Sequence, residues 1–218
     1  AYYCLNFDDI KIQIEQLAVG STQKTISLKS IRSIKIPTPN LPTQQRIAAI
    51  LSAFDDKIAL NRQMNQTLEE MARAVFKSVM QTDTKVSFLE YIELNPRLSI
   101  KKDVPAKFVE MRDLPEKGSS IENFIIRPFS SGMKFQQNDT LLARITPCLE
   151  NGKSAFVDLL EGDEIAHGST EFIVMRAKPG VSPYYVYLLA REPDFREHAI
   201  KSMVGTSGRQ RVQNDALI

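Results

Sequence analysis

The longest regular pattern of apolar and polar positions in the chain runs from Leu41 to Met80. After Pro42 this stretch contains no Gly or Pro, and its apolar positions recur at alternating steps of four and three, the spacing of a coiled-coil seam. The predicted seam residues are Ile47, Leu51, Phe54, Ile58, Asn61, Asn65, Leu68, Ala72, Val75 and Val79. Counted from Gln44, such a helix measures about 55 Å, whereas average globular helices have only three or four turns.

This apolar seam predicts a partner helix. Burying one large apolar side chain contributes roughly 1.5 to 3 kcal/mol, which a solvent-exposed seam would forfeit. The sequence contains no second stretch of matching length, so we expect the partner to come from another copy or from sequence outside these residues. Asn61 and Asn65 on the seam would specify register and direction, as buried polar residues in coiled coils do. The alternative is that both amides lie at the wet edge of the seam.

Shorter patterns surround the long helix. The proline-rich stretch Ile36–Pro42 predicts a stiff connector, and Thr43 is the expected helix N-cap. Beyond Gln81-Thr82-Asp83, segments with β-branched residues and alternating polarity separate Gly- and Pro-containing loops. Strands are predicted at Lys107–Met111, Phe124–Ile126, Thr140–Ile145, Ser154–Val157 and Glu171–Met175, and helices at Asp9–Val19, Pro183–Ala190 and Asp194–Val204. The predicted fold class is therefore α+β, with a long helix followed by a compact domain.

The two ends of the chain resemble each other. The run Tyr2-Tyr3-Cys4-Leu5 matches Tyr184-Tyr185-Val186-Tyr187, and a predicted helix follows each run. Next come Gly20–Ile26 and Gly205–Val212, two loops that combine Gly, hydroxyl and basic residues. Chance similarity is the alternative, but a match in aromatic pair, helix and loop favours an internal repeat. We therefore expect the chain to be a fragment of a longer protein or a half-length protein that dimerises.

Composition narrows the function. The 218 residues carry 28 Lys and Arg against 26 Asp and Glu, a net charge of +2 that does not by itself indicate nucleic-acid binding. No apolar run is long enough to cross a bilayer, so a cytoplasmic protein without membrane contact is expected. The only cysteines are Cys4 and Cys148, and the only histidines His167 and His198. We therefore expect neither a disulfide framework nor a zinc site.

Catalytic motifs are absent from the sequence. It holds no nucleotide-binding Gly-rich fingerprint, no Walker loop and no Gly-x-Ser-x-Gly elbow. Asn95-Pro96 resembles the start of the adenine methyltransferase motif, but Arg97 and Leu98 follow where Pro and an aromatic residue are needed. We interpret the pair as a turn and expect no catalytic residue and no bound metal.

Five loops, together with a basic stretch near the N-terminus, concentrate hydroxyl, amide and basic side chains. Lys, Ser and Thr hold phosphates, while Arg, Gln and Asn form paired hydrogen bonds with base edges, so the loops suit duplex DNA. The alternative is that Gly, Ser and Asn are present only as turn formers. The candidate DNA-contacting residues are Lys134, Arg144, Asn151, Lys153, Ser169, Thr170, Arg209, Gln210 and Arg211, with Lys24 as the counterpart in the first half.

The long helix and several loops together resemble a known family, the specificity subunits of type I restriction-modification enzymes. The matching stretches are Ile36–Pro39, Leu41–Leu51, Asp55–Ile58, Asn61–Asn65 and Leu68–Lys77 around the helix, then Asp139–Pro147, Asn151–Lys153 and Gly168–Phe172. The later stretches are similar to one type of target-recognition domain in that family.

The resemblance implies an architecture. Such subunits hold two target-recognition domains apart with two long antiparallel helices, and each domain reads one half of a split DNA sequence. Here residues 1–40 would be the tail of a preceding target-recognition domain, 41–82 the spacer helix and 83–218 a target-recognition domain. The spacer helix would form an antiparallel coiled coil with a second long helix, supplied by a second copy if the chain is a half-subunit.

The resemblance also implies partners. Modification subunits would bring S-adenosylmethionine to the target adenine, and a restriction subunit would bring ATP and Mg, so the chain itself would need no cofactor. Two other functions remain open from the sequence: the recognition part of a self-contained adenine methyltransferase, and a coiled-coil adaptor that binds protein.

Overall fold

A computed structural model describes residues 2–20, 23–80, 87–206 and 208–217. The chain separates into two compact units, one ending at Met64 and the other beginning at Asn65. This division falls within one long helix, so each unit contains part of it. The three domains expected from the sequence, with boundaries after residues 40 and 82, stay a prediction.

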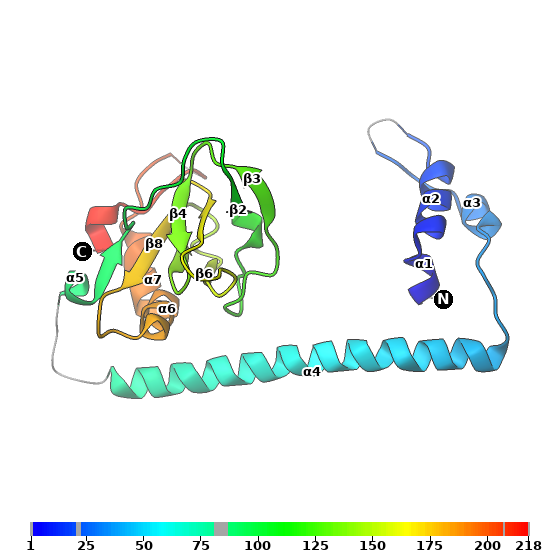
Figure 1. Cartoon of the computed structure of the whole chain (residues 1–218), viewed down its shortest axis with the longest axis horizontal. Coiled ribbons are helices and arrows are strands. Elements are labelled where there is room, and N and C mark those ends of the chain that lie inside the picture. The colour runs from blue at the N-terminus through cyan, green and yellow to red at the C-terminus, as the bar shows by residue number, and fades with distance from the viewer. Residues whose placement is uncertain (1, 21–22, 81–86, 207, 218) are drawn as a thin grey trace. The chain divides into compact units, whose positions relative to one another are not determined.

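The first unit is helical. It contains α1 (Tyr2–Leu5), α2 (Asp8–Leu17), α3 (Leu28–Ser33) and the first part of α4 (Leu41–Val79) (Figure 1). Helix α2 confirms the predicted helix and ends two residues earlier, whereas α3 was not predicted because its polar sequence has too few apolar positions to show a period. Its N-terminus is capped by Ser27, whose Oγ accepts a hydrogen bond of 3.0 Å from the Ser30 N–H.

Helix α4 confirms the predicted long helix, but its N-cap is not Thr43. The Asn40 side-chain oxygen accepts a hydrogen bond of 3.0 Å from the Thr43 N–H, which places Thr43 in the first turn. Pro42 fits that turn because the first helical N–H groups have no intrahelical acceptor, so the missing N–H costs nothing. The prediction placed the cap after the proline, whereas the helix begins before it.

The second unit contains two four-stranded sheets. The first has strand order β1-β8-β5-β6 with every neighbouring pair antiparallel, and the second has order β3-β2-β7-β4 with only β2 and β7 parallel. The strands are β1 (Ile92–Leu94), β2 (Pro105–Val109), β3 (Ile125–Pro128), β4 (Met133–Gln136), β5 (Thr140–Ala143), β6 (Ser154–Phe156), β7 (Ile165–Gly168) and β8 (Phe172–Ala177). Together with α4 this confirms the α+β class.

Strand β8 separates two apolar cores. Successive side chains on a strand point to opposite faces, and accordingly Phe172 and Val174 join one core cluster while Ile173 and Met175 join the other. The first cluster includes residues of both sheets. The second includes residues of α6 (Pro183–Arg191) and α7 (Pro193–Lys201). Because both of its faces are buried, β8 is continuously apolar over four residues.

Five of the eight strands lie where they were predicted, with ends displaced by one or two residues. Strands β1, β4 and β7 were missed, as were α5 (Phe88–Tyr91) and the 3-10 helices η1 (Met111–Asp113) and η2 (Asn214–Leu217). Strand β1 has only three residues, and β4 and β7 contain Met, Lys, Gln, Ala, His and Gly in place of a β-branched run. Helices α6 and α7 confirm two predicted helices, although α7 ends three residues early.

The internal repeat is visible in the order of the elements. Helices α1 and α2 lead to an isolated antiparallel bridge between Val19 and Thr25, and helices α6 and α7 lead to one between Val204 and Arg211. Each bridge encloses a glycine with positive φ, Gly20 in the first loop and Gly205 in the second. In Gly20 an added Cβ would lie 2.2 Å from a backbone oxygen, so the tight loop requires glycine.

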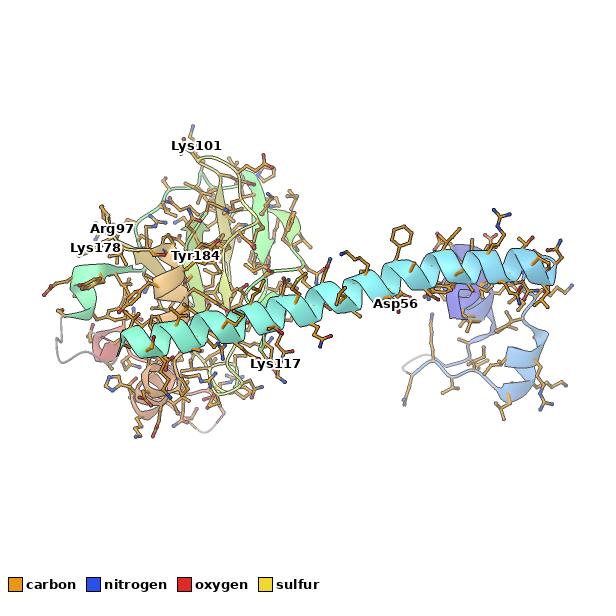
Figure 2. All side chains as sticks on the ribbon, turned by 90° about the horizontal axis from the view of Figure 1, so that it is seen from below. Asp56, Arg97, Lys101, Lys117, Lys178 and Tyr184 are labelled. Carbon is orange, nitrogen blue, oxygen red and sulfur yellow. The ribbon has the colours of Figure 1, made fainter. Side chains whose placement is uncertain are left out.

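The predicted seam of α4 is exposed. Phe54, Leu68, Val75 and Val79 each leave more than half of their surface accessible, and Ile47 and Ile58 nearly half. Figure 2 shows side chains projecting along the length of α4, with Asp56 among them. Of the ten seam residues only Leu51 is partly covered, whereas Phe76, on the adjacent face, is buried. The pairing of the seam with a second antiparallel helix stays a prediction.

Candidate nucleic-acid interface

A shallow hollow of about 330 Å³ lies at the surface of the second unit, where β2 and β3 approach the connection between β7 and β8. Its lining includes Ser169 and Thr170, two of the predicted DNA-contacting residues. The complete lining is Phe108, Glu110, Met111, Arg127, Ser131, Gly132, Gly168, Ser169 and Thr170. It offers one guanidinium and several hydroxyl groups, beside the carboxylate of Glu110.

Two cations are held beside this hollow by aromatic rings. The Arg127 guanidinium lies 4.7 Å from the centre of the Phe108 ring, and the Lys134 amine lies 4.9 Å from that of Phe129. Buried His167 contacts both rings, with centroid distances of 4.9 Å to Phe108 and 5.2 Å to Phe129. Such contacts hold a cation in place without neutralising it, so both charges remain available to an anion.

Two glycines bring the walls of the hollow together. Gly132 has φ +114°, and an added Cβ would lie 2.0 Å from the Gly168 carbonyl oxygen. At Gly168 an added Cβ would collide with the Phe172 ring and with the Val109 carbonyl. The loop between β3 and β4 therefore contacts the loop between β7 and β8 through backbone atoms, which fixes the positions of Ser131 and Ser169.

The C-terminal loop, which carries Arg209, Gln210 and Arg211, is attached to the same region by an ion pair and by hydrogen bonds to backbone carbonyls. Arg211 makes a two-pronged contact with the Glu171 carboxylate, with nitrogen–oxygen distances of 2.7 to 2.9 Å. Arg144 Nη2 donates to the Val212 carbonyl at 2.6 Å, and Thr146 N–H donates to the Gln210 carbonyl at 3.1 Å. The loop that presents Arg209 is therefore held at both the side-chain and the backbone level.

The predicted contact residues fall into two groups. Arg144, Lys153 and Arg211 have internal partners; Lys153 Nζ donates to the Met111 carbonyl at 2.9 Å. Ser169 Oγ accepts from the Glu171 N–H at 3.1 Å, and Asn151 Nδ2 donates to Glu116 at 3.2 Å. Arg209, Thr170 and Asn151 are exposed, and Lys24 is exposed in the loop of the first unit. Gln210 and Lys134 are half-buried.

Sequence reasoning missed two residues of this region. Arg127 lines the hollow but was not among the predicted contacts; its signal in the sequence was the alternation of basic and aromatic residues between Phe108 and Lys134. Glu171 positions Arg211 across 40 residues, and no local pattern reveals such a pair. Asn95, interpreted as a turn, has φ +51° and accepts the Val174 N–H through its side chain at 2.9 Å.

The side chains that could ligate a metal ion are scattered over the described residues. Among them, no group of three or more His, Cys, Asp or Glu side chains is arranged to hold a metal ion. Both cysteines are free thiols. Within the same residues, no helix combines the length and the apolar character that crossing a membrane requires.

Comparison with known proteins assigns the first part of the chain to a class. Residues 1–70 match the family model described as the type I restriction modification DNA specificity domain. These residues are therefore similar to that domain, which agrees with the resemblance predicted from the sequence.

The individual relatives are specificity subunits. The HindI specificity subunit of Haemophilus influenzae is 49% identical over 59 residues, which are 27% of this chain and 13% of that protein. The EcoAI specificity subunit of Escherichia coli is 29% identical over 126 residues, 55% of this chain and 21% of that protein. A solved S subunit from M. genitalium has 17% identity and a TM-score of 0.44, covering 97% of this chain and 59% of that one. The matched segments thus span a minor part of the curated relatives.

Proposed function

We propose that this chain is a sequence-reading, non-catalytic DNA-binding subunit of a type I restriction-modification complex. It reads one half of a bipartite target and positions the DNA for adenine methylation or restriction. The observation that carries the proposal is the match of residues 1–70 to a DNA specificity domain. The internal repeat supports it, because a repeated reading unit suits a target with two halves.

The second unit would contact DNA through the loops around the hollow. Exposed Arg209, and Thr170 with Arg127 in the lining of the hollow, present donors that fit base edges and phosphates. Arg144, Lys153 and Arg211 would act through the loops that they hold in place. Hydrogen-bond donors that are held in fixed positions suit sequence-specific contact with base edges, so the proposed role of these loops is to read the DNA sequence.

The proposed partners follow from the same function. Modification subunits would supply S-adenosylmethionine, and a restriction subunit would supply ATP and Mg. The exposed seam of α4 would pair with a second long helix, which comes from a second copy if the chain is a half-subunit. To test this assignment, the chain is reconstituted with the modification subunit and the methylated adenines are located by sequencing. We expect methylation within a split DNA sequence, and we expect that sequence to change when the recognition domain is exchanged for another.

A salt titration of duplex binding tests the DNA-contacting loop. We expect Arg209→Ala to weaken specific binding and to reduce the slope of log affinity against log salt by about 1, because each phosphate contact releases about one counterion. Lys201→Ala is the charge-matched control, since Lys201 is exposed on α7 and paired with Glu197. An unchanged slope in Arg209→Ala would remove this loop from the interface, and salt-independent binding by the wild type would favour a protein-binding adaptor.

A further inference from the structure

Helix α4 meets the recognition domain at a buried cluster of charged and polar side chains. One carboxylate oxygen of Glu69 lies 2.7 Å from Arg73 Nη2, 3.1 Å from the Tyr187 hydroxyl and 3.5 Å from Arg191 Nε. Only 16% of the Glu69 side chain and 6% of the Arg191 side chain are exposed. We call Glu69, Arg73, Tyr187 and Arg191 the helix junction.

Arg191 joins this junction to the body of the domain. Its Nη1 donates to the Gly152 carbonyl and to Ser154 Oγ, both at 3.2 Å, and its Nη2 donates to the Glu116 carbonyl at 3.3 Å. One guanidinium thus connects the spacer helix, the start of β6 and the loop that precedes β3. Burial raises the pKa of the Tyr187 phenol, so its hydroxyl stays protonated and able to donate.

The junction occupies a separate face of α4 from the predicted seam. Glu69, Arg73, Phe76 and Met80 follow at steps of four, three and four, so they share one face of the helix. The Phe76 and Tyr185 rings pack in a tilted arrangement with centroids 5.1 Å apart, and the Tyr185 hydroxyl lies 3.2 Å from Met80 Sδ. The seam residues, one position earlier, remain exposed, so the domain and a partner helix can hold α4 at the same time.

Apolar contact alone leaves a helix free to rotate or slide on its neighbour, because hydrophobic burial is not directional. A largely buried carboxylate with several fixed donors is directional, because a small displacement of the helix leaves charges without partners, and removing one partner of such a cluster is destabilising. The junction therefore penalises every direction of α4 except the one in which Glu69 reaches Arg191 and Tyr187.

We propose that the helix junction sets the direction in which the spacer helix leaves the recognition domain, and thereby the gap between half-sites that the subunit accepts. This inference rests on the proposed function. The four residues are positioning residues: none of them is a predicted DNA contact, although Arg191 bonds to the backbone of the loop that carries Asn151 and Lys153. They act through the orientation of the domain. Weakening the junction should broaden the range of accepted gaps without changing the bases that are read.

The decisive variant is Glu69→Gln, which keeps the shape and removes the charge. In complex with the modification subunit, it is assayed on duplexes with both half-sites intact and the gap varied one base pair at a time. We expect the affinity ratio between the best gap and its neighbours to fall at least about fivefold, with half-site sequence preference unchanged. Glu70→Gln is the matched control, because Glu70 is exposed on the next position and bonds only to Gln66 in its own helix among the described contacts.

A uniform loss of affinity at all gaps would mean that the junction only stabilises the fold, and an unchanged gap profile would also overturn the inference. Thermal unfolding of both variants identifies a variant that fails to fold, in which case Tyr187→Phe replaces it as the milder change.

A measurement without DNA separates this inference from the proposed function. Spin labels at exposed Asp56, about 20 Å along α4 from Glu69, and at exposed Lys101 report the direction of the helix (Figure 2). The free thiols Cys4 and Cys148 are replaced beforehand. We expect the distance distribution to become at least about twice as wide in Glu69→Gln and to stay unchanged in Glu70→Gln. If the wild type bound no duplex, the proposed function would fail while the distance widths still decided the role of the junction.

Discussion

Individual charged residues of the second unit are paired with one another more often than their sequence positions suggest. Arg211 binds Glu171, and Arg144 binds the Val212 carbonyl. Asp139, only 1% exposed, accepts hydrogen bonds of 2.7 Å from Arg176 Nε and Nη2. A basic residue in a loop is therefore not automatically a DNA contact. Its substitution can act on the loop's position or on stability.

The ion pair of Asp139 and Arg176 predicts a pH-dependent loss of stability. Burial raises the pKa of the Asp139 carboxyl, and Arg176 opposes that rise. Arg176→Met removes the opposition, so the folded state holds the Asp139 proton more tightly than the unfolded chain does, and stability falls as pH rises. We expect a loss of about 3 kcal/mol at pH 7 and a smaller loss at pH 5, measured by urea unfolding.

The control for this change is Arg112→Met. The Arg112 side chain is 79% exposed and pairs with Glu110 at the surface, so its removal should cost less than about 1 kcal/mol at either pH. Equal deficits at pH 5 and pH 7 in Arg176→Met would show that the loss does not come from burying an unpaired carboxylate.

At the scale of elements, the predictions succeeded where one period continued over many residues. The 39 residues of α4 repeat their apolar spacing often enough to leave no alternative, and β8 begins with four uninterrupted apolar residues. By contrast, β7 contains His167 and Gly168, whose burial depends on Phe108, Phe129 and close backbone contact with another loop. Those neighbours lie some 30 to 60 residues away along the chain, so no local window contains the reason for the strand.

The candidate nucleic-acid interface, like the strands, was only partly predictable from local sequence. Loop composition indicated where polar donors concentrate, and Ser169 and Thr170 do line a hollow. Composition did not indicate which donors are already occupied. Lys153 and Arg211 are bound to a carbonyl at position 111 and to a carboxylate at position 171. These partners are distant in the sequence, so the division between internally paired and exposed donors required the structure.

The exposed seam of α4 predicts self-association or pairing with a second helix. Leu68→Glu places a charge on the seam, where it would be buried against a partner. We expect the association to weaken at least about tenfold. The reason is that the lost apolar burial, roughly 1.5 to 3 kcal/mol, adds to the cost of desolvating the charge. Sedimentation equilibrium of the chain, alone and mixed with a matching helix, measures the effect.

Gln66→Glu provides the control for that experiment, since Gln66 lies on the same helix outside the seam and is exposed. It introduces the same charge and should leave association within about twofold. A wild-type chain that stays monomeric at all concentrations, and does not bind a second helix either, would contradict the predicted coiled coil.

At the scale of the whole molecule, charge distribution matters more than net charge. With 28 basic and 26 acidic residues the chain is nearly neutral, so the proposed attraction to DNA phosphates would have to come from local concentrations of charge. The segment from Gly20 to Asn40 has four basic residues and no acid, and the loop from Gly205 to Arg211 has two and no acid. Both follow a pair of helices; an antiparallel bridge closes the start of the first segment, which holds Lys24, and the whole of the second. The repeat therefore places a basic loop at the same point of each half.

This equivalence predicts that Lys24 and Arg209 act on different halves of the target. Each lies four residues after the glycine of its loop, and the two belong to different units with no shared partner among the described contacts. We expect Lys24→Ala and Arg209→Ala each to remove backbone protection in one half-site only, measured by hydroxyl-radical footprinting of the reconstituted complex. Their effects on binding free energy should add to within about 0.5 kcal/mol, because independent sites are additive.

The control is Lys11→Ala, a charge-matched change on α2 outside the loop, which should preserve both footprints. If both loop variants lost protection in the same half-site, the interpretation of the repeat as a pair of reading units would be contradicted.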